Sequence, residues 1–351
     1  MTARARHIIG KIFSIGIPVL LTVGLVWYMF SKVPFGTMME ILRGPVCYWW
    51  ILLAMCLSVV SHVVRAMRWR LQLRSLHIEV PLMALSCSIF GCYALNLLFP
   101  RLGEVWRCTY VSRKGKAPFA TVLGSLVADR AADAVAVLVL FLLALAVAFG
   151  SIEAFMDKYA VGRDILGVLR NPVWWVVGIA SVGFVVGIAL LFKNNPLVRK
   201  GRHVASQIWN GFAAVLTMPG RGKFLLLTIG LWGCYFIQLY VAFFAFGFTE
   251  RLCEESSLAF GLIPCLVAFV LSSVGMAIPS NGGLGPWNLA VMFGLSLYGV
   301  TDSEGVAFSM LQWSGQTVML VLLGIFTMIY IARDSGRASA KPGFENAVSK
   351  S

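Results

Sequence analysis

The sequence predicts an all-α polytopic membrane protein, because it is too apolar for a soluble domain and its charges lie mainly between apolar runs. Of its 351 residues, 59% are hydrophobic and 13% are charged, and the mean hydropathy is +0.83. A soluble domain is nearer half apolar and a quarter charged. The net charge of +14 is explained by basic loops at a membrane surface. No nucleic-acid-binding signature accompanies it, so we expect no nucleic-acid partner.

Six apolar runs are long enough to cross a bilayer, which takes about 20 helical residues. They comprise residues 12–30, 47–68, 119–149, 173–192, 224–247 and 305–332. Residues 196–216 are less apolar, begin with basic residues and carry apolar residues at helical spacing, which predicts an interfacial amphipathic helix. We expect residues 1–335 to form a single membrane domain and residues 336–351 a polar cytoplasmic tail.

The distribution of lysine and arginine predicts the orientation of the chain. The N-terminus and the segments 65–74, 101–116, 193–223 and 333–350 carry most of these residues, whereas the loops between them carry few. Because basic residues concentrate on the cytoplasmic side of membrane proteins, both termini are expected in the cytoplasm.

Two further apolar segments are interrupted by proline and glycine, and each is flanked by loops of one charge sign. Basic loops flank residues 82–113 and acidic loops flank residues 258–300, so each segment is expected to leave the membrane on the side where it began. This predicts two oppositely inserted re-entrant helical hairpins, an arrangement that suggests an inverted repeat and a transport site. The alternative is an ordinary pair of short spans, but residues 287–300 are too few to cross as a helix.

The first break, within residues 96–107 (NLLFPRLGEVWR), supplies one set of candidate binding residues. Arg101 and Arg107 offer forked donors suited to phosphate, and Glu104 can pair with either. The alternative is that these arginines only meet lipid headgroups, which is at least as good an interpretation for Arg107 and Arg113.

Asp129, Arg130 and Asp133 lie inside the apolar run 119–149, with the two aspartates on one helical face. Ionisable residues within a span are a functional-site hypothesis by default. Pairing within this group would leave one net negative charge. We expect Glu104 and Arg101 to contact the group, so that a phosphate competes for its arginines. The alternative is a structural ion pair that locks this helix to the first hairpin.

The second break, residues 279–286 (PSNGGLGP), is rich in glycine and carries no charge. It lacks the GK[ST] of a nucleotide-binding P-loop. Its backbone N–H groups precede a helix that begins near Trp287, and helix N-termini bind anions. The candidate residues are Ser280, Asn281, Gly282, Gly283 and Gly285. The alternative is a tight turn with close packing, which is preferred for Gly283 alone.

The sequence contains no catalytic set and no metal-ligating spacing. The four histidines form no HxH or HxxxH pair, and the eight cysteines form no CxxC. We therefore expect no metal and no cofactor. His62 is interpreted as a packing or headgroup contact. Polar residues inside the spans more often form interhelical hydrogen bonds than bind a ligand; these are Gln238, Gln312, Ser314 and Gln316.

Three motifs together resemble a known family. The pattern N-x-x-x-P-x-x-G-E-x-x-R is supplied by Asn96, Pro100, Gly103, Glu104 and Arg107. It is followed by D-R-x-x-D at 129–133 and PS-x-GG-x-G at 279–285. In this order they resemble the lysylphosphatidylglycerol synthase membrane-domain family, also called flippase-like membrane proteins, over most of the chain. The resemblance implies paired re-entrant segments and the movement of aminoacylated phospholipids or polyprenyl-phosphate-linked sugars between leaflets.

The chain also departs from the family pattern. Arg101 replaces the small residue expected after the proline, and Asn288 stands where the family more often has an acidic residue. The second departure weakens the expectation that the second hairpin binds a cationic headgroup through a carboxylate. Fewer than twenty residues follow residue 332, so the resemblance carries no aminoacyl-transfer activity here.

We therefore predict a lipid translocator of the bacterial inner membrane rather than an enzyme. It would bind an anionic phospholipid or polyprenyl-phosphate-linked lipid, with flipping passive or ion-coupled because no ATP site is visible. One alternative is a membrane-embedded transferase that modifies a lipid headgroup with Glu104 or Asp129 as base. Another is a non-catalytic partner of a lipid synthase or glycosyltransferase. The oligomeric state is not predicted.

Overall fold

The computed structural model describes residues 23–31, 35–99, 101–159, 206, 219–255, 258–278 and 280–339. Every regular element within these ranges is helical. The expected span 173–192 lies outside the described residues, as do nearly all of the expected interfacial helix 196–216 and the first part of the span 12–30.

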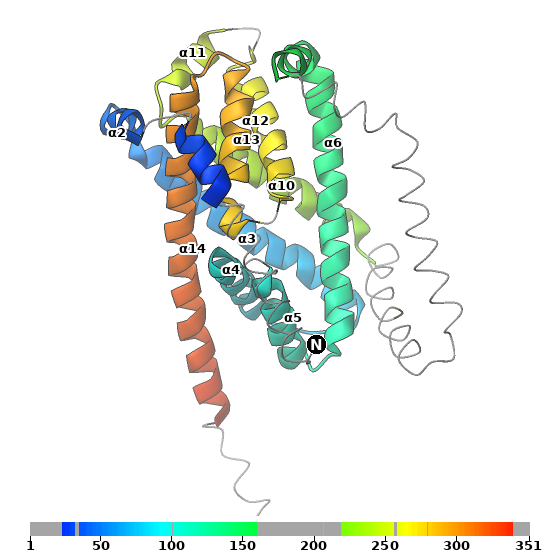
Figure 1. Ribbon diagram of the computed structural model, residues 1–351. Helices are drawn as coiled ribbons and strands as arrows, with labels where there is room; N and C mark the ends of the chain where they lie inside the picture. The colour runs from blue at the N-terminus through cyan, green and yellow to red at the C-terminus, as the bar shows by residue number, and fades with distance from the viewer. Residues whose placement is uncertain are drawn as a thin grey trace, which may run out of the picture.

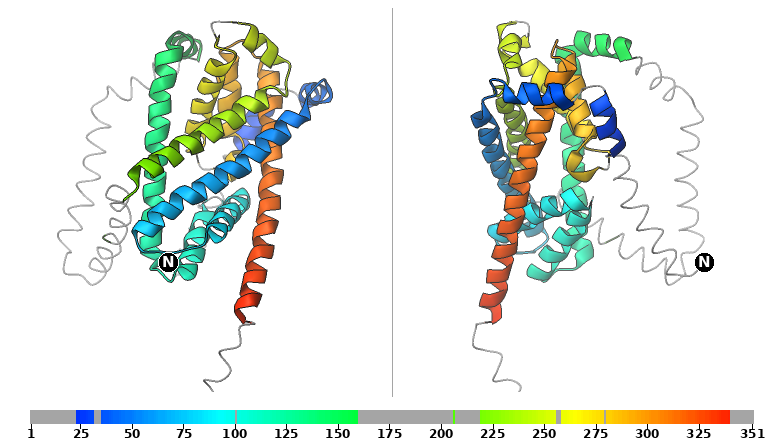
Figure 2. Two further views of the ribbon diagram at one scale, coloured as in Figure 1. Left: turned by 180° about the vertical axis from the view of Figure 1, so that it is seen from behind. Right: turned by 60° about the vertical axis from the view of Figure 1, so that its left-hand side comes forward.

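Within the part of the chain that the structure describes, four helices are long and apolar enough to cross a membrane, which confirms the all-α membrane class. They are α3 (Tyr48–Ser75), α6 (Phe119–Tyr159), α10 (Arg221–Phe243) and α14 (Asp302–Ser339). The exact number of spans stays a prediction. Helices α3 and α10 pack side by side along an oblique line, and α14 runs the full height of the molecule (Figures 1 and 2).

Two of these helices extend beyond the predicted apolar runs. Helix α6 is apolar over Phe119–Ala148, as expected, and bends at Ala148, where φ is −120° and ψ is 27°. Helix α14 continues to Ser339, past the expected end of its span at residue 332. Because helix formation is cooperative, a stable apolar helix can extend into a polar segment.

Shorter helices form two hairpins in opposite halves of the molecule (Figure 1). Helices α4 (Leu82–Leu98) and α5 (Leu102–Lys114) form the first hairpin. Helices α12 (Leu262–Gly275) and α13 (Pro286–Ser296) form the second, with the 3-10 turn η2 (Asn281–Gly283) in its break. All four helices are shorter than the roughly 20 residues that a crossing needs. The described part also includes two short helices, α2 (Phe35–Arg43) and α11 (Phe248–Glu254), and a helical segment at residues 23–31.

Each hairpin begins and ends at one end of the molecule. For the first hairpin, Ile78 before α4 packs against Gly115 after α5. For the second, Arg251 of α11 forms an ion pair of 2.6 Å with Glu304 in the first turn of α14. This arrangement supports two re-entrant hairpins inserted from opposite sides, although re-entry into a bilayer stays a prediction.

The tips of the two hairpins meet between the two halves. In the first break, the Gly103 N–H donates to Asn96 Oδ1 at 2.9 Å, and a Cβ on Gly103 would overlap the carbonyl oxygen of Cys92. Gly282 in the second break has a φ of +60°, and a Cβ there would lie 2.7 Å from Leu97 Cδ2. The first break therefore needs glycine for close backbone approach, and the second favours glycine for its left-handed backbone conformation.

Labelling of introduced cysteines tests whether the first hairpin is re-entrant. His77→Cys and Lys116→Cys replace exposed residues on either side of it. In a background without the exposed native cysteines, both should react with a membrane-impermeant maleimide from the cytoplasmic side only. Reaction from opposite sides would show that α4 and α5 are two spans.

The same labelling applied to the second hairpin tests the predicted opposite insertion. Glu254→Cys and Thr301→Cys replace exposed residues near its two ends. Both should react only from the outer side, and they serve as the orientation control for the first pair.

Candidate functional site

Two arginines of α3 and two aspartates of α6 form a buried cluster, which we call the charge tetrad. Arg65 Nη1 lies 2.9 Å from Asp133 Oδ2 and 3.3 Å from Asp129 Oδ2. Arg68 Nη2 lies 2.7 Å from Asp129 Oδ1 and 2.7 Å from Asp133 Oδ1. Each arginine thus contacts both carboxylates, and no side chain of the tetrad is more than 12% exposed. The tetrad is neutral, which is what makes burial of four charges tolerable.

The tetrad joins three helices. Besides α3 and α6, it reaches α10 through Tyr235, whose hydroxyl oxygen accepts hydrogen bonds from Arg65 Nε and Nη2, both at 3.2 Å. Because both aspartates are paired with arginines, we interpret the tetrad as a structural lock between α6 and α3. The ion pair to the first hairpin that the sequence analysis considered is a different contact, formed by Arg130.

A second ion pair, more exposed than the tetrad, joins α6 to the first hairpin. Arg130 Nη2 lies 2.6 Å from Glu104 Oε1, and the two side chains are 37% and 31% exposed. Arg130 Nη1 also lies 3.9 Å from Asp133 Oδ2, at the edge of the tetrad. The expected contact between Glu104 and the 129–133 group is therefore present, with Arg130 as the partner.

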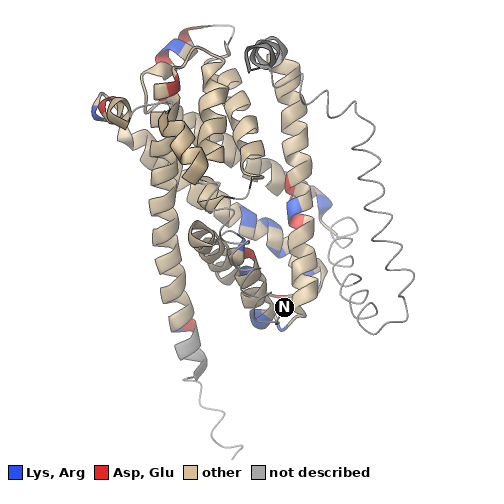
Figure 3. Cartoon of the chain, viewed as in Figure 1, with Lys and Arg blue, Asp and Glu red and all other residues tan. Residues whose placement is uncertain are grey.

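Both hairpin breaks line a single cavity of about 670 Å³. Helices α3, α6, α10 and α14 complete its wall. Eight residues that the sequence analysis selected as candidates line it: Asn96, Arg101, Glu104, Arg130, Asp133, Ser280, Gly282 and Gly283. Figure 3 shows that the charged residues gather where α3, α5 and α6 approach one another, whereas α12 and α13 carry none. The cavity therefore has a charged side and an uncharged side.

The remaining candidates lie outside the cavity lining. Gly103 closes the first break, and Asp129 belongs to the tetrad. The Gly285 N–H donates to Asn288 Oδ1 at 3.1 Å, so Asn288 holds the turn before α13. Asn281 lies in η2.

Arg107 is fully buried on α5 and does not line the cavity. Its guanidinium carbon lies 3.8 Å from the centre of the Trp69 ring, a cation–π contact. None of its three nitrogens has a hydrogen-bond partner among the described residues. Arg107 therefore contributes positive charge from behind the site and does not contact a ligand in the cavity directly.

The arginines of α3 change the expected charge of the site. Arg65, Arg68, Arg107 and Arg130 provide four positive charges, against three carboxylates from Glu104, Asp129 and Asp133. One positive charge is in excess, where the sequence analysis expected one net negative charge. That expectation considered α6 alone, because the distribution of basic residues assigned the whole segment 65–74, with Arg65 and Arg68, to the cytoplasmic membrane surface.

A signal for these two arginines was present in the sequence. Arg65 and Arg68 are three residues apart, and Asp129 and Asp133 are four apart, so each pair lies on one helical face. Matched pairs of opposite charge at helical spacing in two apolar runs indicate an interhelical cluster. The arginine pair and the aspartate pair are about 60 residues apart in the sequence, and only the fold shows that they contact each other.

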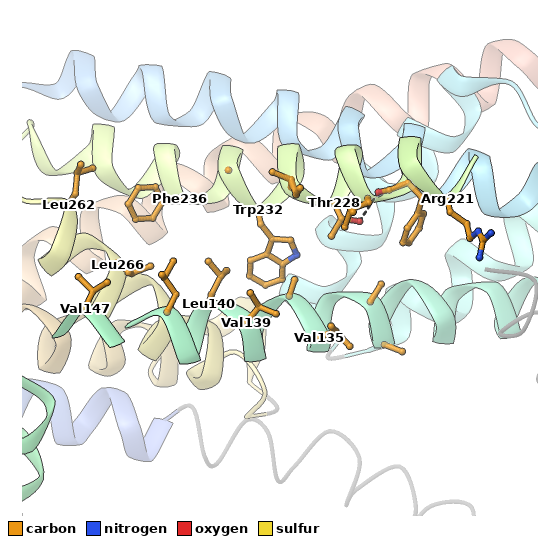
Figure 4. Close-up of a pocket in the computed structure, with 18 of the residues that line it drawn as sticks. Val135, Val139, Leu140, Val147, Arg221, Thr228, Trp232, Phe236, Leu262 and Leu266 are labelled. Atoms are coloured by element: carbon orange, nitrogen blue, oxygen red, sulfur yellow. Dashed lines mark hydrogen bonds between the residues drawn. The ribbon is translucent and has the colours of Figure 1, made fainter. Parts of the chain in front are cut away.

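An apolar groove of about 990 Å³ lies beside the cavity, between α6, α10 and α12 (Figure 4). Its wall includes Val139 and Leu140 of α6, Phe236 of α10 and Leu266 of α12. Trp232 of α10 lines both the groove and the charged cavity. The groove and the cavity are thus adjacent at Trp232.

These features define a polytopic membrane protein with a charged internal cavity between two broken helical hairpins. The family model described as "Lysylphosphatidylglycerol synthase TM region" matches residues 15–332, so the chain belongs to that family. This confirms the resemblance and relates the chain to lipid modification or transport. A search of curated proteins and a search of solved structures each found no significant match.

The tetrad predicts a large loss of stability when one carboxylate is removed. Asp129→Asn leaves buried guanidinium charge uncompensated, which costs about 3–5 kcal/mol. The matched control is Arg251→Gln, because it breaks an exposed ion pair, and such pairs contribute about 0–1 kcal/mol. Thermal unfolding of the purified protein in detergent should show a large loss for the first variant and little change for the second. Equal losses would contradict the structural role of the tetrad.

Proposed function

We propose that this protein binds an anionic lipid in the cavity and moves it between the two leaflets. The observation that carries the proposal is the cavity, because residues of both hairpin breaks and the arginines Arg101 and Arg130 line it. Broken helices that meet around a polar cavity are the usual design of a transport site. The arginines of the site outnumber its three carboxylates, which favours an anionic occupant.

The phosphate of the lipid is assigned to Arg130 and Arg101. Arg65 and Arg68 are committed to the tetrad, and Arg107 is buried behind the cavity. Arg130 is partly exposed and held mainly by Glu104 at 2.6 Å, whereas Asp133 lies 3.9 Å away. A phosphate can therefore replace Glu104 at Arg130 without disturbing the tetrad. Guanidinium groups suit this exchange because they bind carboxylate and phosphate with the same forked geometry.

The apolar groove supports a lipid over a soluble anion. A soluble anion needs only the charged cavity, whereas a lipid also needs a place for its hydrocarbon chains. The groove beside the cavity is lined almost entirely by apolar side chains of α6, α10 and α12. Because Trp232 contacts both spaces, a lipid can place its phosphate in the cavity and a chain in the groove.

The second break acts as the opposing gate in this proposal. Its Gly282 carbonyl oxygen accepts a hydrogen bond from Trp313 Nε1 at 3.0 Å, which ties η2 to α14. Leu97 at the tip of the first hairpin abuts Gly282. Separation of these tips on one side or the other would expose the cavity to one leaflet at a time.

The two carboxylates that a transferase would use as a base are both engaged. Glu104 is paired with Arg130, and Asp129 is fully buried in the tetrad. A general base must be free to accept a proton within reach of the substrate. These contacts favour translocation over headgroup chemistry.

Exchange between Glu104 and phosphate predicts opposite effects on binding and on transport. Glu104→Gln leaves Arg130 without its competing carboxylate, so an anionic lipid should bind about tenfold more tightly and leave more slowly. Titration with labelled phosphatidylglycerol should show the tighter binding, and leaflet exchange in proteoliposomes should be slower than in the wild type. Arg130→Gln should weaken binding and transport together.

The controls for this experiment separate the alternatives. Arg251→Gln, at the outer end of the molecule, should leave both measurements unchanged. Weaker binding by Glu104→Gln would contradict the exchange. If the wild type moves no lipid but mass spectrometry shows an altered headgroup, the protein is an enzyme. If neither lipid movement nor an altered headgroup is detected, the result favours a non-catalytic partner of a lipid synthase or glycosyltransferase.

Filling the groove should block a lipid chain. Ala136 of α6 lines the groove, whereas Ala134 on the same helix is exposed and does not. Ala136→Phe should slow leaflet exchange several-fold, while Ala134→Phe should leave it unchanged. Equal rates in the two variants would show that no chain occupies the groove, for example because another segment of this protein covers it.

A further inference from the structure

Four buried polar atoms around the cavity have no hydrogen-bond partner among the described residues. They are both ring nitrogens of His62, Oε1 of Gln312 and Nε1 of Trp232. All three residues line the cavity, from α3, α14 and α10, and His62 and Gln312 are each only 4% exposed. Buried polar groups are nearly always satisfied in native proteins, so unpartnered groups at a cavity point to a ligand.

Neutral polar groups and indole rings occupy the same region of the cavity. Gln238 Nε2 donates to Gln316 Oε1 at 3.1 Å, and Gln316 Nε2 donates to Ser58 Oγ at 2.9 Å. This chain of amides and a hydroxyl crosses from α10 through α14 to α3. Three indole rings also line the cavity, those of Trp232, Trp287 and Trp313.

The cavity offers no free carboxylate among the described residues. Its lining includes two acidic side chains, and both are paired: Glu104 with Arg130, and Asp133 with Arg65 and Arg68. The second hairpin carries no acidic residue between Leu262 and Ser296 among the described residues, and Asn288 lies outside the cavity lining, where its Oδ1 accepts a hydrogen bond from the Gly285 N–H. An ammonium group would therefore meet excess positive charge without a counter-ion.

A hydroxyl group fits the unpartnered atoms where an ammonium does not. A hydroxyl both donates and accepts, so it can satisfy the acceptor Gln312 Oε1 and the donor Trp232 Nε1 alike. A neutral imidazole also presents one donor and one acceptor. An ammonium has only donors and would leave the indole N–H of Trp232 unsatisfied.

We infer that the cavity recognises a phosphodiester lipid whose headgroup is uncharged and rich in hydroxyl groups, either a glycerol or a ring polyol such as a sugar. The inference rests on the proposed function and names its substrate class. In this arrangement Arg130 and Arg101 take the phosphate on the charged side of the cavity. Gln312, His62 and Trp232 take the hydroxyl groups on the neutral side.

The test measures the binding of four lipids with identical chains to the purified full-length protein in nanodiscs. Phosphatidylglycerol and phosphatidylinositol carry a glycerol and a ring polyol, phosphatidylmethanol has the same phosphodiester charge without hydroxyl groups, and lysylphosphatidylglycerol carries ammonium groups. The two hydroxylated lipids are compared to decide between glycerol and ring polyol. At least one of them should bind about tenfold more tightly than phosphatidylmethanol, and lysylphosphatidylglycerol should bind more weakly than phosphatidylglycerol.

The variant Gln312→Leu tests whether Gln312 is responsible for the preference for hydroxylated headgroups. It should reduce the tenfold preference over phosphatidylmethanol to less than about threefold, because it removes an acceptor for the headgroup. Its thermal stability without lipid should be unchanged or higher, since the lost amide oxygen has no partner in the protein. The matched control is Ser314→Leu on the same helix, which is exposed, lies outside the cavity lining and should keep the preference.

Three results would overturn the inference. Equal binding of phosphatidylglycerol, phosphatidylinositol and phosphatidylmethanol would show that only the phosphate is recognised, and tightest binding of lysylphosphatidylglycerol would show a cationic preference. An unchanged preference in Gln312→Leu would remove the proposed contact. Equal binding of the three anionic lipids, or an unchanged preference in Gln312→Leu, leaves anionic-lipid binding intact. Tightest binding of lysylphosphatidylglycerol, or failure of all four lipids to bind, would also overturn the proposed function.

Discussion

The pairing of Arg65 and Arg68 with Asp129 and Asp133 is the interaction on which the rest of the site depends. Four charges are buried together, and their mutual neutralisation is what allows α3 and α6 to pack there. It also sets the rotation of α6 about its axis. Successive helical residues are about 100° apart, so once residues 129 and 133 face α3, Arg130 must point elsewhere. It points to the first hairpin, where it meets Glu104.

The two hairpins contribute different kinds of side chain to the cavity. The first brings Glu104 and Arg101 beside the charged surface of α6, whereas the second brings only glycine, serine and apolar residues. A ligand that spans both must therefore be charged at one end and neutral at the other. The glycines of the breaks make this arrangement compact, because the tips approach each other to the distance of a side-chain contact at Leu97 and Gly282.

The sequence predicts well where the helices lie, but it predicts poorly which side chains of different helices contact one another. Apolar runs locate α3, α6, α10 and α14, and the proline–glycine breaks locate both hairpins, because length and composition determine whether a segment crosses a bilayer. The same reasoning misplaces Arg65 and Arg68, since an arginine at the end of an apolar run is normally a headgroup residue. Only the packing of α3 on α6 shows that they are buried. Arg107 is similar, because its contact with the Trp69 ring depends on tertiary structure.

The charge of the buried groups argues for the kind of lipid that fits. The guanidinium groups of Arg65, Arg68, Arg107 and Arg130 face three carboxylates, so a singly charged phosphodiester neutralises these groups, and the exposed Arg101 adds one further positive charge beside them. When that phosphate takes Arg130, Glu104 is released toward the cavity while the tetrad stays intact. The net charge of the occupied site is the same whichever anion holds Arg130, and the exchange requires no proton. A headgroup with ammonium groups would instead restore or increase the excess positive charge, which is expensive at membrane depth.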